Sequence, residues 1–317
     1  MFKVYQNFIG IDIGKDEFYV GQADIQEVVI YPNQKDGFIS FVDKFKEIQA
    51  KTLIVLETTG GYELSLIRYL QAQGFFVHRA NTRKVKSFIR SLGNLGKSDA
   101  IDARGLAFYA KERHEQLGLY EPPADEKLLK LIRRREDLNK ILVQEKNRLK
   151  APDQEELKDS FKTIIRVLEN ELNVLEDRID KLIQANKEYT EKRSVLKTLP
   201  GIGTIISAQL LVLVPELGQL DRRKIASLGG VAPHPNESGK KIGYRYVRGG
   251  RYDVKRALFL AAMTASRGKS RLGEFYRKLI ASGKKKMVAL VAVMRKILVI
   301  ANARMRDYYL HAVEITA

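Results

Sequence analysis

Residues 8–23 read FIGIDIGKDEFYVGQA, and this stretch decides the fold of the first third of the chain. FIGIDI (8–13) and EFYVGQA (17–23) are rich in β-branched and aromatic residues, and the turn tripeptide GKD separates them. This pattern predicts a β-hairpin. EVVIY (27–31) extends it and predicts a third strand, so the chain opens with a three-stranded meander.

The segments after the meander alternate between helix and strand. Apolar residues recur at helical spacing in the longer segments, and the short apolar runs between them are typical of buried strands. The expected helices cover residues 36–49, 62–73 and 96–113, and the expected strands cover 52–57 and 75–80. The order β-β-β-α-β-α-β-α is that of the RNase H-like fold, a mixed sheet covered by helices, and we expect it over residues 1–121.

Four carboxylates fall where this fold would bring them together. Asp12 lies on the first strand and Glu57 ends the fourth. Asp99 and Asp102 are three residues apart, so they share one face of the last helix. The first and fourth strands are neighbours in this fold, and the last helix packs across them. Because four carboxylates in one site need a counter-charge, the pattern predicts a catalytic site that binds Mg²⁺ or Mn²⁺.

Each of these acids also has a structural alternative. Asp12 would suit a turn, or the phosphate loop of an actin-like or sugar-kinase domain, although the loop 14–16 lacks the usual hydroxyl residues. Glu57 would cap a strand, Asp99 would cap the helix, and Asp102 would favour the helix dipole. The coincidence of all four acids at the expected places favours the site.

A long, highly charged helical region follows Pro122-Pro123. Leucines in residues 125–150 follow a 3-4 spacing, Ala151-Pro152-Asp153 breaks the pattern, and residues 155–193 resume it. This near-heptad seam predicts a helical hairpin or coiled coil over residues 122–194. A two-helix connector packed on its own chain is the alternative. The narrow seam and charged flanks favour self-association into a homo-oligomer, a dimer or tetramer.

Positive charge is concentrated in the last two-fifths of the chain. The net charge is +18, of which residues 1–194 carry +2 and residues 195–317 carry +16. Such asymmetry indicates a polyanionic partner, most simply nucleic acid and here double-stranded DNA. An anionic membrane surface is the alternative. Apolar stretches such as IISAQLLVLV (205–214) show that the basic half is a folded, mostly helical domain.

Two motifs of the basic domain suit phosphate chemistry. The TLPGIGTII segment (198–206) resembles a helix-hairpin-helix turn, which exposes backbone N–H groups at a helix N-terminus. The segment 229–256 places Ser238 in a Pro/Asn/Gly-rich loop among cations and tyrosines. A hydroxyl displayed there could attack a held phosphodiester, and a surface turn before a basic helix is the alternative. The predicted nucleic-acid-binding residues are Gly201, Gly203, Lys240, Lys241, Arg245, Arg248 and Arg251.

Several absences narrow the possibilities further. The chain has no cysteine, so disulfides and thiolate metal sites are excluded and a reducing compartment is expected. No apolar run reaches the roughly 18 residues of a membrane span, and the N-terminus does not resemble a signal peptide, so we expect a cytoplasmic protein. No phosphate-binding loop of the Walker type is present. His234 precedes Ser238 by four residues, but no serine–histidine–aspartate order stands out.

The order and spacing of five motifs resemble those of the DEDD transposases of the insertion-sequence one-ten class. These enzymes are related to Piv-type DNA invertases and include bridge-RNA-guided recombinases. The motifs span nearly the whole chain, and they are IDIGKD (11–16), LETTGGY (56–62), GKSDAIDA (96–103), LPGIG (199–203) and GGVAPHPNESGKKIGYRYVRGGR (229–251).

The resemblance implies a RuvC-like domain, a coiled coil and a C-terminal transposase domain over residues 195–317. It implies that Asp12, Glu57, Asp99 and Asp102 bind Mg²⁺, and that Ser238 forms a covalent phosphoserine intermediate while DNA is cut and rejoined. It also implies a Holliday-like junction, an active site composed from different protomers of an oligomer, and a structured guide RNA. Such a protein would be nucleoid-associated.

Two other functions remain open at the level of sequence. One is a RuvC-like, metal-dependent nuclease that uses water, with Ser238 merely structural. The other is a non-enzymatic scaffold that binds nucleic acid and whose acids are structural. Covalent trapping of DNA on Ser238 separates the first from a recombinase, and loss of activity on replacing Asp12 or Asp102 separates the second.

Overall fold

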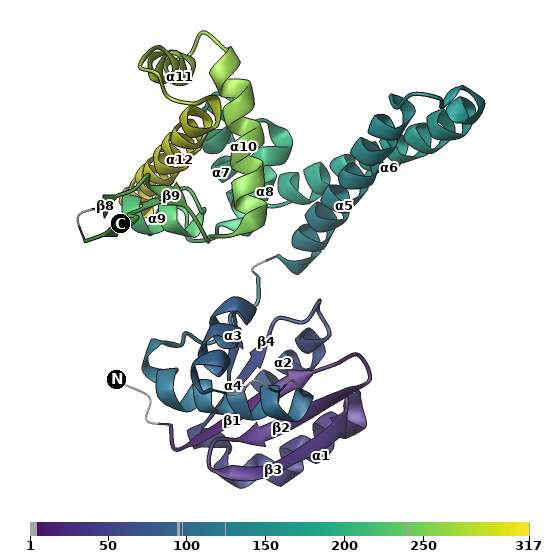
Figure 1. Cartoon of the computed structure of the whole chain (residues 1–317), viewed down its shortest axis with the longest axis vertical. Helices are drawn as coiled ribbons and strands as arrows, with labels where there is room; N and C mark the ends of the chain where they lie inside the picture. Colours follow the sequence, from purple (N-terminus) through teal and green to yellow (C-terminus); the bar gives the residue numbers. More distant parts are fainter. Residues whose placement is uncertain (1–4, 94–95, 97, 124, 240, 317) are drawn as a thin grey trace. The chain divides into compact units, whose positions relative to one another are not determined.

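The computed structural model describes residues 5–93, 96, 98–123, 125–239 and 241–316. The chain divides into two compact units, Met1–Pro122 and Pro123–Ala317 (Figure 1). Among the described residues, no helix is both long enough and apolar enough to cross a membrane.

The first unit is built on a five-stranded mixed sheet. Its strands lie in the order β3-β2-β1-β4-β5. The β1–β2 and β2–β3 pairs are antiparallel, so the predicted meander is confirmed, whereas β1–β4 and β4–β5 are parallel. The strands are β1 (Asn7–Ile13), β2 (Glu17–Gln22), β3 (Ile25–Pro32), β4 (Thr52–Glu57) and β5 (Phe76–Ala80).

Helices cover both faces of this sheet. In β4, Ile54 and Leu56 pack with the helices α1 and α2, whereas Leu53 and Val55 pack with α3 and α4. A strand buried on both faces has no polar side to display, which explains the continuous apolar run of β4. The helices are α1 (Lys35–Phe45), which continues as a 3-10 turn (Lys46–Lys51), α2 (Glu63–Ala72), α3 (Thr82–Ser91) and α4 (Asp99–Arg113).

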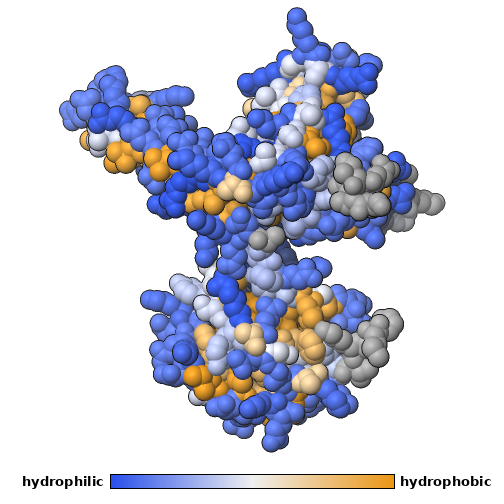
Figure 2. Space-filling model, turned by 180° about the vertical axis from the view of Figure 1, so that it is seen from behind, coloured by the Kyte–Doolittle hydropathy of each residue, from blue (hydrophilic) through white to orange (hydrophobic). Residues whose placement is uncertain are grey.

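The second unit begins with a helical hairpin. The helices α5 (Glu126–Leu149) and α6 (Lys158–Gln184) pack against each other within one chain, around buried leucines such as Leu138 and Leu172. The predicted break at residues 151–153 separates them, and Asp153 adopts a positive φ of 58° there. Several apolar side chains along the hairpin stay exposed, and Figure 2 shows apolar side chains gathered along one side of it.

The rest of the second unit is a helical core. Buried residues of α7, α8, α9, α10, α11 and α12 form one cluster, with Leu258, Ile297 and Leu298 wholly buried in it. A polar junction ties the hairpin to this core, because the Glu136 carboxylate of α5 accepts a hydrogen bond from Gln209 and forms an ion pair with Arg256. The helices are α7 (Lys187–Lys197), α8 (Thr204–Leu213), α9 (Arg222–Leu228), α10 (Tyr252–Arg267), α11 (Arg271–Ala281) and α12 (Lys286–Thr316).

The second unit has two local features that the leucine spacing and loop composition do not specify. The helical pattern of residues 155–193 is interrupted, because α6 ends at Gln184 and Asn186 caps α7 by accepting the Tyr189 N–H. Two short strand pairs form around Ser238: β8 (Lys241–Ile242) pairs with β7 (Glu237–Ser238), and β9 (Tyr246–Val247) pairs with β6 (Pro233–His234).

Candidate active site

The four predicted acids line one pocket of the first unit. Asp12 lies near the end of β1 and Glu57 ends β4. These strands are parallel neighbours, paired up to Ile11 and Leu56, so both acids lie at the same edge of the sheet. Asp99 begins α4 and Asp102 lies in its first turn, and both line the same pocket.

The N-terminus of α4 corrects one structural alternative. Ser98, not Asp99, caps the helix, because its side-chain oxygen accepts the Ile101 N–H at 3.3 Å. Asp99 is therefore the first residue of the helix, and its carboxylate is not needed as a cap. Both Asp99 and Asp102 line the pocket from this first turn.

Glycines in the sheet allow α4 to lie directly on it. A Cβ at Gly10 of β1 would overlap the Ala103 carbonyl oxygen and the Ala107 nitrogen of α4. A Cβ at Gly21 of β2 would come within 2.8 Å of the Arg104 nitrogen. This close approach packs the part of α4 that follows its first turn directly on β1 and β2. Sequence reasoning missed Gly10, although a glycine inside a buried strand often marks close backbone approach.

The Asp12 carboxyl is electrostatically strained. Burial, followed by the carboxylates of Asp102, Asp99 and Glu57, raises its pKa from the ordinary 3.8 to about 7. A hydrogen bond from the Ile13 backbone opposes the rise. Lys15 and Lys86 line the same pocket, yet Asp12 still has a raised pKa. An additional cation at this site would therefore be stabilised.

The donor set suits a hard divalent cation, but the carboxylates do not close on a single point. Mg²⁺ and Mn²⁺ prefer oxygen ligands, and the pocket presents four carboxylates. Within the part of the chain that the structure describes, no three His, Cys, Asp or Glu side chains stand together as a ready metal cage. The raised pKa of Asp12 shows that the other three carboxylates act on it electrostatically. Such an effect acts across the pocket and does not require the four side chains to contact one another.

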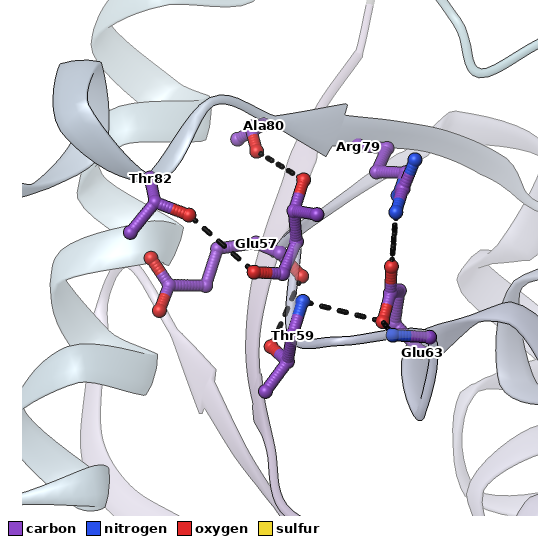
Figure 3. A network of polar contacts seen from close by, with 8 residues as sticks. Glu57, Thr59, Glu63, Arg79, Ala80 and Thr82 are labelled. Atoms are coloured by element: carbon purple, nitrogen blue, oxygen red, sulfur yellow. Dashed lines mark hydrogen bonds and ion pairs between the residues drawn. The ribbon is translucent and has the colours of Figure 1, made fainter. Parts of the chain in front are cut away.

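Hydrogen bonds of the threonines that follow Glu57 anchor this end of β4 at the pocket. The Thr59 hydroxyl donates to the Glu57 carbonyl oxygen at 3.3 Å, and the Thr82 hydroxyl donates to the Thr58 carbonyl oxygen at 3.4 Å. The Thr58 hydroxyl donates to the Ala80 carbonyl oxygen at 3.3 Å. Figure 3 shows the Glu57 side chain pointing away from the Glu63–Arg79 side of this network. The loop after β4 is thus tied to the end of β5 and the start of α3.

Glu63 is wholly buried and binds the backbone of this loop. Its carboxylate accepts the N–H groups of Thr59 at 3.2 Å and Gly61 at 2.9 Å, and it pairs with the Arg79 guanidinium (Figure 3). Burial disfavours the ionised form, but the backbone donors and Arg79 outweigh it, so the pKa of Glu63 lies below its ordinary value. Glu63 is therefore a positioning residue for the loop that follows Glu57.

Ser238 belongs to the second unit, on an exposed hairpin. It pairs with Lys241 across the β7–β8 turn, and Gly239 enters that turn with a positive φ of 55°. Among the described residues, no side chain makes a hydrogen bond with the Ser238 hydroxyl. His234 lies on the neighbouring β6–β9 pair, opposite Tyr246. Ser238 itself is exposed.

The two ends of the serine segment are clamped together. Gly230 and Gly250 are in backbone contact, so a Cβ on either would overlap the opposite strand of the chain. The Arg251 N–H donates to the Leu228 carbonyl oxygen at 2.8 Å. The Arg251 guanidinium forms a two-pronged ion pair with Glu216, at 2.6 and 2.7 Å, which helps to hold the pKa of Glu216 below its ordinary value against the opposing effect of burial.

Two family models match the sequence of this chain. A model of DEDD type, described as "Transposase", matches residues 9–152, which contain all four acids. A second, described as "Transposase IS116/IS110/IS902 family", matches residues 193–277, which contain Ser238. The chain belongs to the IS110/IS116/IS902 family of transposases. It is a DNA transposase or recombinase.

Relatives extend this likeness along the whole chain. A pilin gene-inverting protein of Moraxella lacunata is 29% identical over 318 residues, covering 95% of this chain and 96% of that protein. The corresponding protein of Moraxella bovis is equally similar. An uncharacterised 44.8 kDa protein of the insertion element IS116 from Streptomyces clavuligerus is 27% identical over 146 residues, covering 44% of this chain and 36% of that protein.

The predicted nucleic-acid-binding arginines of this transposase differ in their exposure and in how strongly other side chains already engage them. Arg245 is exposed and pairs loosely with Glu237 at 3.6 Å. Arg248 is exposed and lies over the Tyr246 ring at 4.6 Å. Arg251 is already engaged by Glu216, so in this structure it fixes the loop and is less available to a phosphate.

The remaining predicted residues fall into two classes. Gly201 adopts a positive φ of 87°, and a Cβ there would overlap the Ala261 carbonyl oxygen, so this glycine serves the packing of the turn on α10. Gly203 precedes α8 with open space around it, which leaves room for a ligand. Lys240 lies outside the described residues, and for Lys241 only the backbone pairing with Ser238 is described.

Proposed function

We propose that this transposase cuts and rejoins DNA through a covalent phosphoserine on Ser238, with Mg²⁺ or Mn²⁺ held by Asp12, Glu57, Asp99 and Asp102. The observation that carries the proposal is the shared pocket of the four acids, formed by β1, β4 and α4. The strand order of this unit is that of the RNase H-like fold, and we assign residues 1–121 to a RuvC-like domain of that fold.

The carboxylates would bind the metal and the serine would carry out the substitution at phosphorus. When bound, the cation supplies Lewis acidity and neutralises charge on the transferring phosphoryl group. The Ser238 oxygen forms a bond to phosphorus while the bond from phosphorus to the departing strand oxygen breaks. Serine loses its proton and the departing oxygen gains one. Rejoining is the reverse reaction with a new strand hydroxyl, so no nucleotide cofactor is consumed.

The basic unit supports the handling of DNA. Residues 195–317, which we assign to the transposase domain, carry a net charge of +16. Arg245 and Arg248 lie exposed on the same loop as Ser238 and would hold the scissile phosphate. Gly201 and Gly203 form the turn before α8, where backbone N–H groups would contact the DNA backbone. Lys240 and Lys241 follow Ser238 in the sequence and would add further positive charge to the DNA contact.

Oligomerisation and RNA guidance complete the proposal. Residues 122–194 would act as a coiled coil between protomers, because side chains such as Ile164, Val167 and Val174 on the α5–α6 hairpin are 46%, 56% and 50% exposed. A homodimer or tetramer would bring the acids of one protomer to the serine of another. A structured guide RNA would supply sequence recognition, and the enzyme would work at the nucleoid in the cytoplasm.

Covalent trapping tests the serine chemistry. DNA nicked beside the scissile phosphate should leave a protein–DNA adduct with Mg²⁺ present, and Ser238→Ala should abolish that adduct while it keeps DNA binding. Ser227→Ala, on α9, is the matched control and should retain the adduct. Cleavage by Ser238→Ala at the rate of the unaltered protein, with no adduct under any metal condition, would identify a RuvC-like nuclease that uses water.

A further inference from the structure

A polar hollow of about 740 Å³ lies on the first unit, outside the pocket of the four acids. Side chains of β5, α3 and the second half of α4 form its walls. We name it the α3 groove, and the lining residues that matter for the argument are Arg79, Arg83, Lys84, Ser87, Phe88 and Arg113.

Every lining side chain that carries a fixed charge is cationic. Residues 1–122 as a whole carry 16 Lys/Arg and 15 Asp/Glu, so this concentration is local. The helix α3 carries four cations and no acid, and two of these cations, Arg83 and Lys84, line the groove. Burial and the nearby Lys84 lower the pKa of His78 against the opposing hydrogen bond with the Gly118 carbonyl oxygen, which favours the neutral imidazole.

Two of the lining cations contact other side chains of the protein, and two do not pair with any acid among the described residues. Glu63 holds Arg79, and the Arg113 guanidinium lies over the Phe88 ring at 6.0 Å. Arg83 and Lys84 are exposed, and no acid among the described residues pairs with either side chain. Exposed cations that lack local partners and converge on one hollow create a potential that attracts phosphate groups.

The helix α3 also reaches the pocket of the four acids. Lys86 lines that pocket, whereas Arg83, Lys84 and Ser87 of the same helix line the groove. A polyanion lying in the groove can therefore continue over α3 to the carboxylates. A single phosphate would not need this continuity, so the arrangement favours an extended strand.

We propose that the α3 groove binds the phosphodiester backbone of the nucleic-acid strand whose phosphate is cut beside the four acids. The proposal rests on the proposed function for the identity of that phosphate. It adds a nucleic-acid contact in the first unit, whose net charge over residues 1–122 is only +1, outside the strongly basic unit.

Salt-dependent binding tests the groove in the full-length chain. The background carries Asp12→Ala, and the buffer contains EDTA, so that binding is measured without cleavage. Arg83→Gln combined with Lys84→Gln should reduce the slope of log K against log salt by about 1.4 for single strands and about 1.8 for duplex DNA. Lys44→Gln combined with Lys46→Gln removes two exposed cations around the end of α1 and is the matched control.

Photocrosslinking tests the location directly. Benzoylphenylalanine at Ser87 should crosslink to labelled DNA or RNA, and the same group at Ser40 should not. Both serines are exposed on helices and donate to the carbonyl oxygen four residues earlier, so the two sites are matched. Thermal unfolding confirms that each variant is folded.

The outcomes separate the groove from the proposed chemistry. An equal slope change in both double variants, or no crosslink at Ser87, overturns the groove even if phosphoserine forms. If no phosphoserine can be trapped but the Arg83/Lys84 double variant still shows the reduced salt slope, the phosphoserine mechanism is refuted and the groove remains a binding site. Parallel arms with single-stranded DNA, duplex DNA and RNA identify the strand. If inorganic phosphate or a mononucleotide binds the groove as tightly as a nucleic-acid strand does, the proposal is contradicted.

Discussion

Replacing Asp12 by Asn should stabilise the metal-free first unit at pH 8. The change removes the half-buried charge that burial and the carboxylates of Asp102, Asp99 and Glu57 oppose. Asparagine has nearly the same shape and keeps an oxygen for the hydrogen bond from the Ile13 backbone. The expected gain is therefore electrostatic and not a packing effect.

The size of this gain follows from the pKa of Asp12. Each tenfold change in proton affinity corresponds to about 1.4 kcal/mol, so raising the pKa from 3.8 to about 7 would cost a fully buried carboxylate about 4 kcal/mol. Asp12 is only half-buried, and solvent screening reduces the cost to about 1–2 kcal/mol.

The pH dependence has a definite sign. Because the folded-state pKa of Asp12 is raised, the folded state binds the extra proton between pH 4 and about 7. The unaltered protein should therefore lose stability across this window as the pH rises, and the loss is complete above about 7. The advantage of Asp12→Asn should be largest at pH 8 and should shrink toward zero near pH 4.

Hydrogen exchange of peptides from β1 and β4 measures this local stability without unfolding the second unit. Asp16→Asn, an exposed residue of the same pocket, is the matched control and should change little. Added Mg²⁺ should protect the unaltered protein more than Asp12→Asn. Equal protection of the two proteins in EDTA at pH 8, or a gain that persists at pH 4, would refute the electrostatic reasoning.

Three further substitutions address how the site is held. Gly10→Ala should destabilise the first unit by about 2 kcal/mol or more and abolish cleavage, because its Cβ overlaps the α4 backbone, whereas Gly118→Ala should be neutral in thermal unfolding because open space surrounds it. Glu63→Gln should cost about 3 kcal/mol in denaturant unfolding by leaving Arg79 without its buried partner, and equal midpoints would contradict this. Arg251→Ala should slow strand joining several-fold by loosening the serine loop, while DNA binding measured by anisotropy falls much less.

The regular elements could be predicted because their signals are local. The meander, the alternation after it and the break at residues 151–153 follow from spacing and turn residues over short windows. Other features depend on tertiary contacts and could not be predicted from local patterns. β8 and β9 are two residues each, and such short strands pair according to what lies beside them, so their sequence could not reveal that they join β7 and β6.

The sequence by itself determined which chemical groups are available: four acids at set places in the strand order, one serine in a basic loop, and cations concentrated after residue 194. Tertiary structure decided what each group does. Glu57 and Glu63 are six residues apart, yet one lines the pocket and the other is buried against Arg79. Arg248 and Arg251 are three apart, yet one is exposed and the other is paired with Glu216. Burial, pairing and pKa depend on atoms brought close by folding, and local sequence does not encode these distances.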